Sequence, residues 1–322
     1  MKIPFCRRRF IVLLAAVVSL NFISLSSVLG AEYPVKPINV VVSSTAGGSS
    51  DVAVRILVEE VRLGVPIVVI NKGGPGGALA ASLVANEKPD GYNLLFTNSS
   101  TMTANFAVFP SLSYKRTDFF PLFMTFISPI KIAVKSDSPY KSLKDFLDAA
   151  KKNPGKLRSG TFSASITLVW ESLLKQEGID MVHQQYKGAA EVAVALLGGH
   201  IDLFLDNLTP LIPQVEAGQV RLLACISSKR DKKYPDVPTL KDLGYSIFSR
   251  DFWAGFFAPA GLQQNITDKL VQVFEKAMSL PSVQTKMEIA GLIPHFMGPK
   301  EFAPFIEEEY KFYMSLARQK GK

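Results

Sequence analysis

The sequence predicts an α/β protein with two domains, and three observations support this prediction. Short β-branched or apolar runs alternate with amphipathic segments, which is the pattern of strands alternating with helices. The run 38–42 (Ile-Asn-Val-Val-Val) leads through a Gly pair into a segment in which Val54, Leu57 and Val61 share one helical face. The length of 322 residues suits two domains of ordinary size better than one core.

Strands are expected where such runs are bounded by turn residues. Pro89-Asp90-Gly91 forms a turn ahead of one strand, and Ser128-Pro129 separates two apolar runs. The expected strands are 38–42, 66–70, 93–97, 130–134, 181–186, 201–205 and 220–226.

Helices are expected where apolar residues recur every three or four positions between start and stop signals. Ser142 opens one helix, Asn153-Pro154-Gly155 ends it, and Gly198-Gly199 ends another. Ser50 is expected to cap the helix after the first strand, with Asp51 in its first turn. The other expected helices are 78–86, a segment ending near 178, 191–197, 210–217, 266–279, 282–290 and 299–318.

The first 31 residues have the layout of a secretory signal peptide. Lys2 and the arginine run 7–9 precede an apolar stretch from 10 to about 20, and Gly30 and Ala31 mark the expected cleavage site. An uncleaved anchor is the alternative, but the apolar run is short for a membrane span. The arginines loosely fit a twin-arginine signal, whereas the strongly apolar run favours general secretion. We therefore expect an exported protein.

Charge and cysteine content limit the possible functions. The formal net charge is +8, but four basic and no acidic residues lie in the first 31 positions, which leaves +4 on the remainder. This excess forms no basic helix or aromatic-basic stripe, which argues against nucleic-acid binding. Cleavage of the signal peptide removes Cys6 and leaves Cys225 alone, so no internal disulfide is expected. Cys225 lies in an apolar run and is expected to be a buried small hydrophobe.

The turn after the first strand is the leading candidate for a binding site. A strand, a Gly pair and a helix start in succession expose backbone N–H groups that can hold an anion without Lys or Arg. We predict that this turn binds one carboxylate of a small ligand. The alternative is an ordinary tight connection between a strand and a helix. The candidate residues are Ser44, Thr45, Ala46, Gly47, Gly48 and Ser49.

A second hydroxyl-rich helix start lies at 159–167, in what should be the other domain. Two facing helix N-termini would suit a ligand with two acidic ends. The alternative is a capped helix start with no ligand. The candidate residues are Thr161, Ser163, Ser165 and Thr167.

Four further candidates follow strands. Ser99 and Ser100 lie at the end of a strand where ligands bind in open α/β sheets. Asp206 either accepts from a ligand amine or water, or caps the helix near Pro210. Tyr186 either offers its hydroxyl to the ligand or packs in the core.

We expect the chain to cross between the domains twice. The first crossing is placed at Ser128-Pro129 and the return between about 249 and 257. The first lobe would then comprise 32–129 and 250–322, and the second lobe 130–249.

Catalytic and cofactor motifs are not found in the sequence. The three His residues have no metal-ligand spacing, and the serines form no Gly-x-Ser-x-Gly elbow. Leu79 replaces the last Gly of a dinucleotide fingerprint, and Gly155-Lys156 lacks the rest of a phosphate-binding loop. We therefore expect no enzyme activity, no cofactor and no metal.

Several motifs occur in one order along nearly the whole chain after position 31. They are Tyr33-Pro34 with Lys36-Pro37, Ala46-Gly47-Gly48 with Asp51, Asn71 with Gly74, Gly76 and Gly77, Pro89-Asp90-Gly91-Tyr92, Pro154-Gly155-Lys156-Leu157, Tyr186-Lys187-Gly188, Leu197-Gly198-Gly199 with Asp202, Asp206, Pro235-Asp236-Val237-Pro238-Thr239, and Trp253-Ala254-Gly255 through Ala258-Pro259-Ala260-Gly261. With these motifs the chain resembles the Bug-type extracytoplasmic solute receptors, the binding proteins of tripartite tricarboxylate transporters.

The resemblance implies a type II periplasmic-binding-protein fold, in which two lobes joined by crossover strands close over a ligand. It implies a monomeric periplasmic receptor for a small carboxylate, such as a di- or tricarboxylate, an acidic amino acid or an aromatic acid, delivered to membrane permease subunits. Backbone amides and water would hold the carboxylate. The alternatives are a sensory subunit without a permease and, less favoured, an enzyme acting on a carboxylate.

The chain departs from the family pattern in both turns. Ser43-Ser44-Thr45 stands where the family commonly has Pro-Phe-Pro, and Ser49 replaces a frequent third Gly. Phe162 interrupts the usual small residues of the second turn and either narrows the pocket or packs beside it. These changes predict a pocket that is more polar at one end than is usual for the family.

Overall fold

The computed structural model describes residues 32–320, except 110, 228 and 246–249, as an α/β protein with two mixed sheets. The predicted signal peptide lies outside the described residues. Within the described part, no helix is both long enough and apolar enough to span a bilayer.

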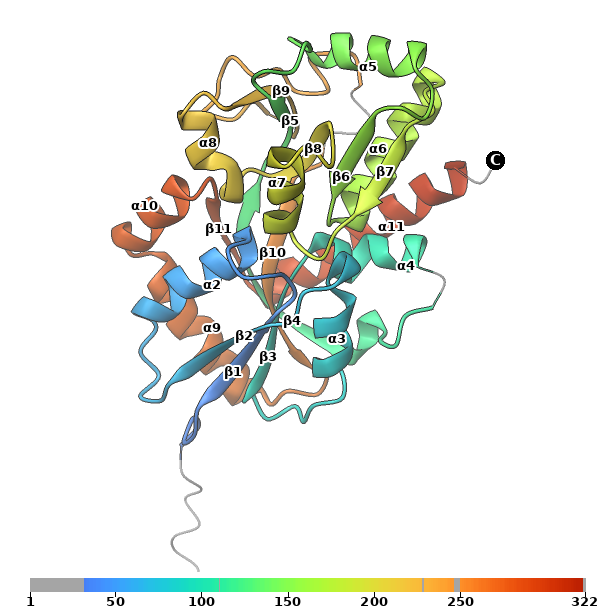
Figure 1. The fold of residues 1–322 in the computed structure, drawn as a ribbon. Coiled ribbons are helices and arrows are strands. Elements are labelled where there is room, and N and C mark those ends of the chain that lie inside the picture. The colour runs from blue at the N-terminus through green and yellow to red at the C-terminus, as the bar shows by residue number, and fades with distance from the viewer. Residues whose placement is uncertain (1–31, 110, 228, 246–249, 321–322) are drawn as a thin grey trace, which may run out of the picture.

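The first lobe is built on a six-stranded sheet in the order β11-β4-β10-β3-β1-β2 (Figure 1). β1, β2 and β3 are parallel, and β10 runs antiparallel to both β3 and β4. Its strands are β1 (Ile38–Val42), β2 (Ile67–Asn71), β3 (Asn93–Asn98), β4 (Phe119–Ser128), β10 (Phe252–Pro259) and β11 (Ile293–Met297). Its helices are α2 (Ser49–Glu60), η1 (Pro75–Gly77), α3 (Ala78–Val84), η2 (Ser100–Ala104), α4 (Asn105–Val108), η3 (Arg116–Asp118), α9 (Gln264–Met278), α10 (Pro281–Ile289) and α11 (Pro299–Lys320).

The second lobe is built on a five-stranded sheet in the order β7-β6-β8-β5-β9. β6, β7 and β8 are parallel, whereas β5 is antiparallel to β8 and β9. Its strands are β5 (Ile130–Lys135), β6 (Arg158–Thr161), β7 (Val182–Gln185), β8 (Leu203–Asn207) and β9 (Val220–Ile226). Its helices are α5 (Leu143–Lys152), α6 (Ala164–Glu177), α7 (Ala189–Leu197), η4 (Thr209–Leu211) and α8 (Ile212–Glu216).

The chain changes sheet at two places. Pro129 alone separates β4 of the first sheet from β5 of the second. The chain returns after β9 and enters the first sheet as β10, between β3 and β4. We propose on this basis that the lobes comprise 32–129 with 250–322, and 130–249.

Aromatic side chains fill the core of the first lobe. Phe96, Phe123 and Phe256 are fully buried on neighbouring strands. The Phe256 ring contacts those of Phe96 and Phe123, and Phe274 of α9 contacts Phe123 and Phe256. Burial of one such side chain contributes roughly 2–3 kcal/mol. The rigid sheet that results fixes the positions of the loops at the carboxyl ends of β1 and β3.

The helix after β1 is capped two residues earlier than expected. Gly48 is its N-cap residue and Ser50 lies inside it, so the prediction that Ser50 caps the helix is wrong. Gly48 has no side chain to offer, and the N-terminus of α2 therefore has no side-chain cap.

Candidate functional site

The loop between β1 and α2 forms the first corner of the candidate site. Gly48 leaves the α2 N-terminus uncapped, and the amides of Ser49, Ser50 and Asp51 donate to no acceptor among the described residues. Helix amides in this position, together with the helix dipole, favour an anion. Ser49 and Ser50 are buried, which removes these groups from bulk water.

Buried hydroxyl groups surround this helix start. Ser44 Oγ, Thr45 Oγ1, Ser50 Oγ and Ser99 Oγ are buried and make no hydrogen bond to the described residues, and the same is true of Asn98 Nδ2. Leaving a buried polar group unpaired costs about 1–3 kcal/mol. Several such groups at the carboxyl ends of β1 and β3 indicate a place where a polar ligand supplies their partners.

Asp51 holds the β1–α2 loop in shape. Its carboxylate accepts from Gly47 N at 2.9 Å, Arg55 Nε at 2.9 Å and Asn71 Nδ2 at 3.0 Å. Burial acts to raise the pKa of this carboxyl, but these hydrogen bonds and the Arg55 charge outweigh burial and lower it. Asp51 is therefore a structural anion, and the Gly47 amide that it binds is not available to a ligand.

Ala46 and Gly47 are exposed to solvent, and their role is to set the shape of the turn between β1 and α2. The Gly47 backbone has φ +78°, in the left-handed region that β-branched residues avoid. A Cβ added at this position would have no atom within 4 Å, so a substitution there costs backbone strain and causes no clash. We expect Gly47→Val to lower the free energy of unfolding by about 1–2 kcal/mol through backbone strain. Chemical denaturation checks this, and Gly47→Ala should show a smaller loss. An unchanged midpoint in Gly47→Val would contradict it.

The β6–α6 loop forms the second corner. Ser163 is the N-cap of α6, and its Oγ accepts from Ile166 N. Phe162 is buried and its ring contacts Phe252, so of the two readings it packs in the core. The predicted helix start therefore exists, but the Ser163 side chain caps it.

Asp206 lies behind this loop, fully buried. Its Oδ2 accepts from Thr161 Oγ1 at 2.8 Å and Phe162 N at 3.0 Å, and its Oδ1 accepts from Asn207 N and Nδ2. Burial raises the pKa of the Asp206 carboxyl to about 7, although these hydrogen bonds favour the charged form. Both oxygens are used within the second lobe, where Thr161 and Asp206 order the β6–α6 loop.

The two corners face each other and touch. Ser100 Oγ lies 2.6 Å from Ser163 Oγ and 3.0 Å from Ser165 Oγ, and it accepts from Ser165 N at 3.1 Å. Gly76 N donates to Phe162 O at 3.3 Å across the same boundary. Thr45 of the first lobe packs against Gly188 of the second. The lobes are therefore closed on each other in this structure.

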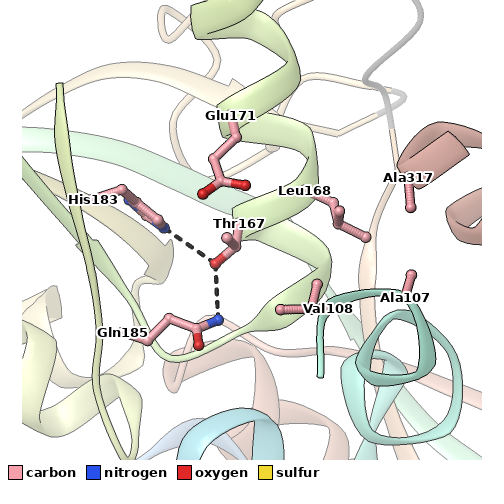
Figure 2. A pocket seen from close by; sticks show the side chains of 8 residues that line it. All are labelled: Ala107, Val108, Thr167, Leu168, Glu171, His183, Gln185 and Ala317. Atoms are coloured by element: carbon pink, nitrogen blue, oxygen red, sulfur yellow. Dashed lines mark hydrogen bonds between the residues drawn. The ribbon is translucent and has the colours of Figure 1, made fainter. Parts of the chain in front are cut away.

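Thr167 lies apart from this contact. It lines a pocket of about 600 Å³ together with side chains of α4, α6, β7 and α11, and its Oγ1 is bonded to His183 Nε2 and Gln185 Nε2, both at 3.1 Å (Figure 2). Tyr186 lines another pocket, of about 710 Å³, with Thr45 and Ala46, and donates to Gln184 Oε1. The structure thus brings together the candidates Ser44, Thr45, Gly48, Ser49, Ser99, Ser100, Ser163 and Ser165, and it places Thr167 elsewhere.

Two residues outside the predicted set belong with these corners. Asn98 and Asn207 are fully buried, and each has a side-chain polar atom without a partner in the described part of the chain, as does Ser50 of the first corner. Asn98 and Asn207 are the last residues of β3 and β8, which is the sequence signal that could have identified them.

The basic side chains beside the two corners are paired with carboxylates: Arg55 Nε lies 2.9 Å from Asp51 Oδ1, and Arg250, which lines a small cavity with Ser165, lies 2.8 Å from Glu309 Oε1. The buried Lys131 ammonium lies 2.6 Å from Asp231 Oδ2 and is paired there. Among the residues that the structure describes, no group of three His, Cys, Asp or Glu side chains could hold a metal ion. The arrangement offers neutral donors in a buried setting, which suits an anion held by hydrogen bonds.

Comparison with known proteins identifies the family. The model of the tripartite tricarboxylate transporter family receptor matches residues 54–321. A Cupriavidus necator protein from the gbd 5′ region is 33% identical over 330 residues, covering 98% of each chain. The structure of the periplasmic binding protein BugD is 30% identical, with a TM-score of 0.84 over 90% of this chain and 99% of that one.

Two further solved structures come from Rhodopseudomonas palustris. One, with adipate, is 27% identical with a TM-score of 0.84 over 90% of this chain and 99% of that one. The other, with bound malate, is 27% identical with a TM-score of 0.82 over 88% and 100%. The fold, the match to the family model and these likenesses agree, and the chain belongs to the tripartite tricarboxylate transporter receptor family, the Bug-type periplasmic solute-binding proteins.

Proposed function

We propose that this protein captures a small organic acid between its two lobes and delivers it to a tripartite tricarboxylate-type permease. The observation that carries the proposal is the first corner, where the uncapped α2 N-terminus lies beside the buried hydroxyls of Ser44, Ser50 and Ser99. A carboxylate placed there accepts from several preorganised donors at once, and such bonds are about twice as strong as neutral ones.

The relatives support the same reading. One related structure contains malate and another contains adipate, both small carboxylates. The family name supports a permease partner. The signal-like segment ahead of Gly30 and Ala31 supports export to the periplasm. We propose further that the acid leaves unchanged, because the two corners supply hydrogen bonds rather than a nucleophile and base.

The proposal is tested first by identifying the ligand. Mass spectrometry of the protein purified from the periplasm under native conditions should find a retained small acid. A panel of carboxylates should then raise the melting temperature, and NMR of the released acid should show no chemical change. A melting temperature unmoved by every acid in the panel would overturn the proposal, and a chemically altered acid would favour an enzyme.

Side-chain deletion in the first corner gives a sharper result. We expect Ser50→Ala and Ser99→Ala each to weaken acid binding about tenfold, because each removes a hydrogen bond to a charged group worth about 1.5 kcal/mol or more. Ser113→Ala is the matched control, since Ser113 is exposed and, among the residues that the structure describes, its hydroxyl bonds to Ser82 alone. Calorimetric titration measures the three affinities. Equal affinities in all three variants would show that the Ser50 and Ser99 hydroxyls do not bind the acid.

A further inference from the structure

The first lobe contains a cavity of about 280 Å³ that takes no part in the two corners. Its walls come from β4, β10, β11 and α11, and from the segment that leads into β10. None of the described residues that line it belongs to either corner. Pockets for drug-sized ligands span roughly 300 to 1,000 Å³, so this cavity suits a smaller molecule.

Two buried polar atoms in the residues that line this cavity lack hydrogen-bond partners. Trp253 and Glu309 are only 1% and 2% exposed, yet Trp253 Nε1 and Glu309 Oε2 bond to nothing among the residues that the structure describes. The indole N–H lies close enough to the carboxylate to favour its charged form, but no hydrogen bond joins them. Native proteins rarely leave such groups unpaired. Two of them at one cavity therefore point to a bound group that serves both.

The neighbours of these two residues fix their side chains. The Trp253 ring packs edge-on against the rings of Phe302 and Phe305, at centroid distances of 5.2 and 5.8 Å. Glu309 Oε1 accepts from Arg250 Nη1 at 2.8 Å, and Oε2 is the oxygen that is left over. Both unpaired atoms are thus held in place before anything binds, which lowers the entropic cost of binding.

The chemistry of the two atoms selects the ligand group. Trp253 Nε1 only donates, so the ligand group has to accept. Burial raises the pKa of the Glu309 carboxyl, although the Arg250 charge acts to lower it. Glu309 Oε2 accepts when the carboxyl is ionised and donates when it is protonated. A hydroxyl or a carboxamide serves both atoms in either state, because each of these groups donates and accepts.

Charged ligand groups fit the cavity less well. Glu309 and Asp251 would attract an ammonium, but an ammonium cannot accept from Trp253. A carboxylate can accept from Trp253, but it would meet two acidic side chains and the single guanidinium of Arg250. The other titratable side chain that lines the cavity, His295, is exposed to solvent.

We propose that this cavity is a second binding site, for a small uncharged molecule that carries a hydroxyl or carboxamide group on a short apolar chain. The polar group bonds to Trp253 Nε1 and Glu309 Oε2. The chain packs against Met124, Met297 and Phe305, which supply the apolar part of the wall. The proposal does not depend on the acid site between the lobes.

Nuclear magnetic resonance tests the proposal at the indole itself. The sequence contains two tryptophans, Trp170 and Trp253, so a ¹⁵N-labelled sample gives two indole signals, and Trp253→Phe identifies which is which. The probes are butanamide, 1-butanol, butanoate and butylammonium at millimolar concentration. We expect butanamide or 1-butanol to move the Trp253 signal saturably and to leave the Trp170 signal in place. The two ions should bind about tenfold or more weakly.

Two results would overturn the proposal. If neither butanamide nor 1-butanol moves the Trp253 signal saturably, water alone serves the two atoms. If butanoate or butylammonium moves that signal at the same concentration as the uncharged probes, the cavity does not select an uncharged group. Binding of butanoate at the corners does not confuse the reading, because the signal reports on the Trp253 indole.

The Glu309→Gln variant tests the role of the carboxylate. It removes a negative charge and leaves the Arg250 charge uncompensated, so the ratio of butanamide to butanoate affinity should fall about tenfold relative to the wild-type protein. Glu308→Gln is the matched control, since Glu308 is the exposed neighbour on α11 and should keep the wild-type ratio. A purely structural Glu309 would weaken both probes equally, and an unchanged ratio would overturn its role in the site. The wild-type comparison holds even if the variant folds poorly.

Discussion

Replacement of Gly188 by Ala is expected to weaken ligand binding about ten- to a hundredfold by keeping the lobes apart. A Cβ at this position would overlap Thr45 Oγ1 and lie only 3.0 Å from Thr45 N. The hydroxyl can rotate away, but the backbone amide cannot. Gly188 has an extended backbone (φ −178°), so Ala strains nothing locally and the effect comes from the contact between lobes. Overpacking of this kind costs about 1–3 kcal/mol.

Two measurements separate lost closure from lost folding. Small-angle scattering in the presence of ligand should show a larger radius of gyration for Gly188→Ala than for the wild-type protein. Calorimetry gives the affinities. Gly298→Ala is the matched control, since the nearest atom to its Cβ lies 3.9 Å away. If Gly188→Ala binds and closes like this control, the contact between Thr45 and Gly188 does not limit closure.

Replacement of Asp206 by Asn is expected to lower the free energy of unfolding by about 2–4 kcal/mol. The two carboxylate oxygens accept from Thr161 Oγ1, two backbone amides and Asn207 Nδ2. An amide at this position turns its NH₂ group toward donors on one side, and those donors lose their acceptor. Thermal unfolding measures the loss. Stability equal to the wild-type protein would show that the β6–α6 loop does not depend on this carboxylate.

The same carboxylate gives a pH dependence with a definite sign. Burial raises the pKa of Asp206 from 3.8 to about 7 in the folded protein, so between these values the folded state binds a proton that the unfolded state has released. The contribution of this group to stability is therefore fully present below about pH 4 and is lost as the pH rises through 7. The melting temperature of Asp206→Asn, measured as a function of pH, should lack this decrease.

The first corner could be predicted from the sequence because its information is local. A β-branched run followed by a Gly pair and a helical pattern specifies strand, turn and helix start without reference to the rest of the chain. The break at Ser128-Pro129, on which the proposed lobe boundary rests, is local in the same way. The assignment of Ser50 as the cap failed because Gly48, two residues earlier, already ends the turn.

The contact between corners could not be predicted, because it depends on how the lobes meet. Ser100 and Ser163 are 63 positions apart and sit on different sheets, and no periodicity connects them. Thr167 was misleading for a geometric reason. It lies one helical turn beyond Ser163, and there α6 already faces β7, so its hydroxyl meets His183 and Gln185. β11, which pairs antiparallel with β4, was not expected at all, since Ile293–Met297 contains Pro294 and His295 and does not read as a strand.

The insertion of β10 between β3 and β4 sets the order in which the protein can be completed during synthesis. The strands of the second sheet all lie within 130–226, and the segment that pairs Thr239 with Cys225 follows soon after, so that lobe can fold before residues 252–259 have emerged. The first sheet has to wait for residues 252–259, and until then β3 and β4 each keep an open edge on a hydrophobic layer. Open edges of this kind invite pairing with other chains. The nascent polypeptide is therefore most exposed to aggregation while its amino-terminal half is finished but its carboxyl-terminal quarter is not.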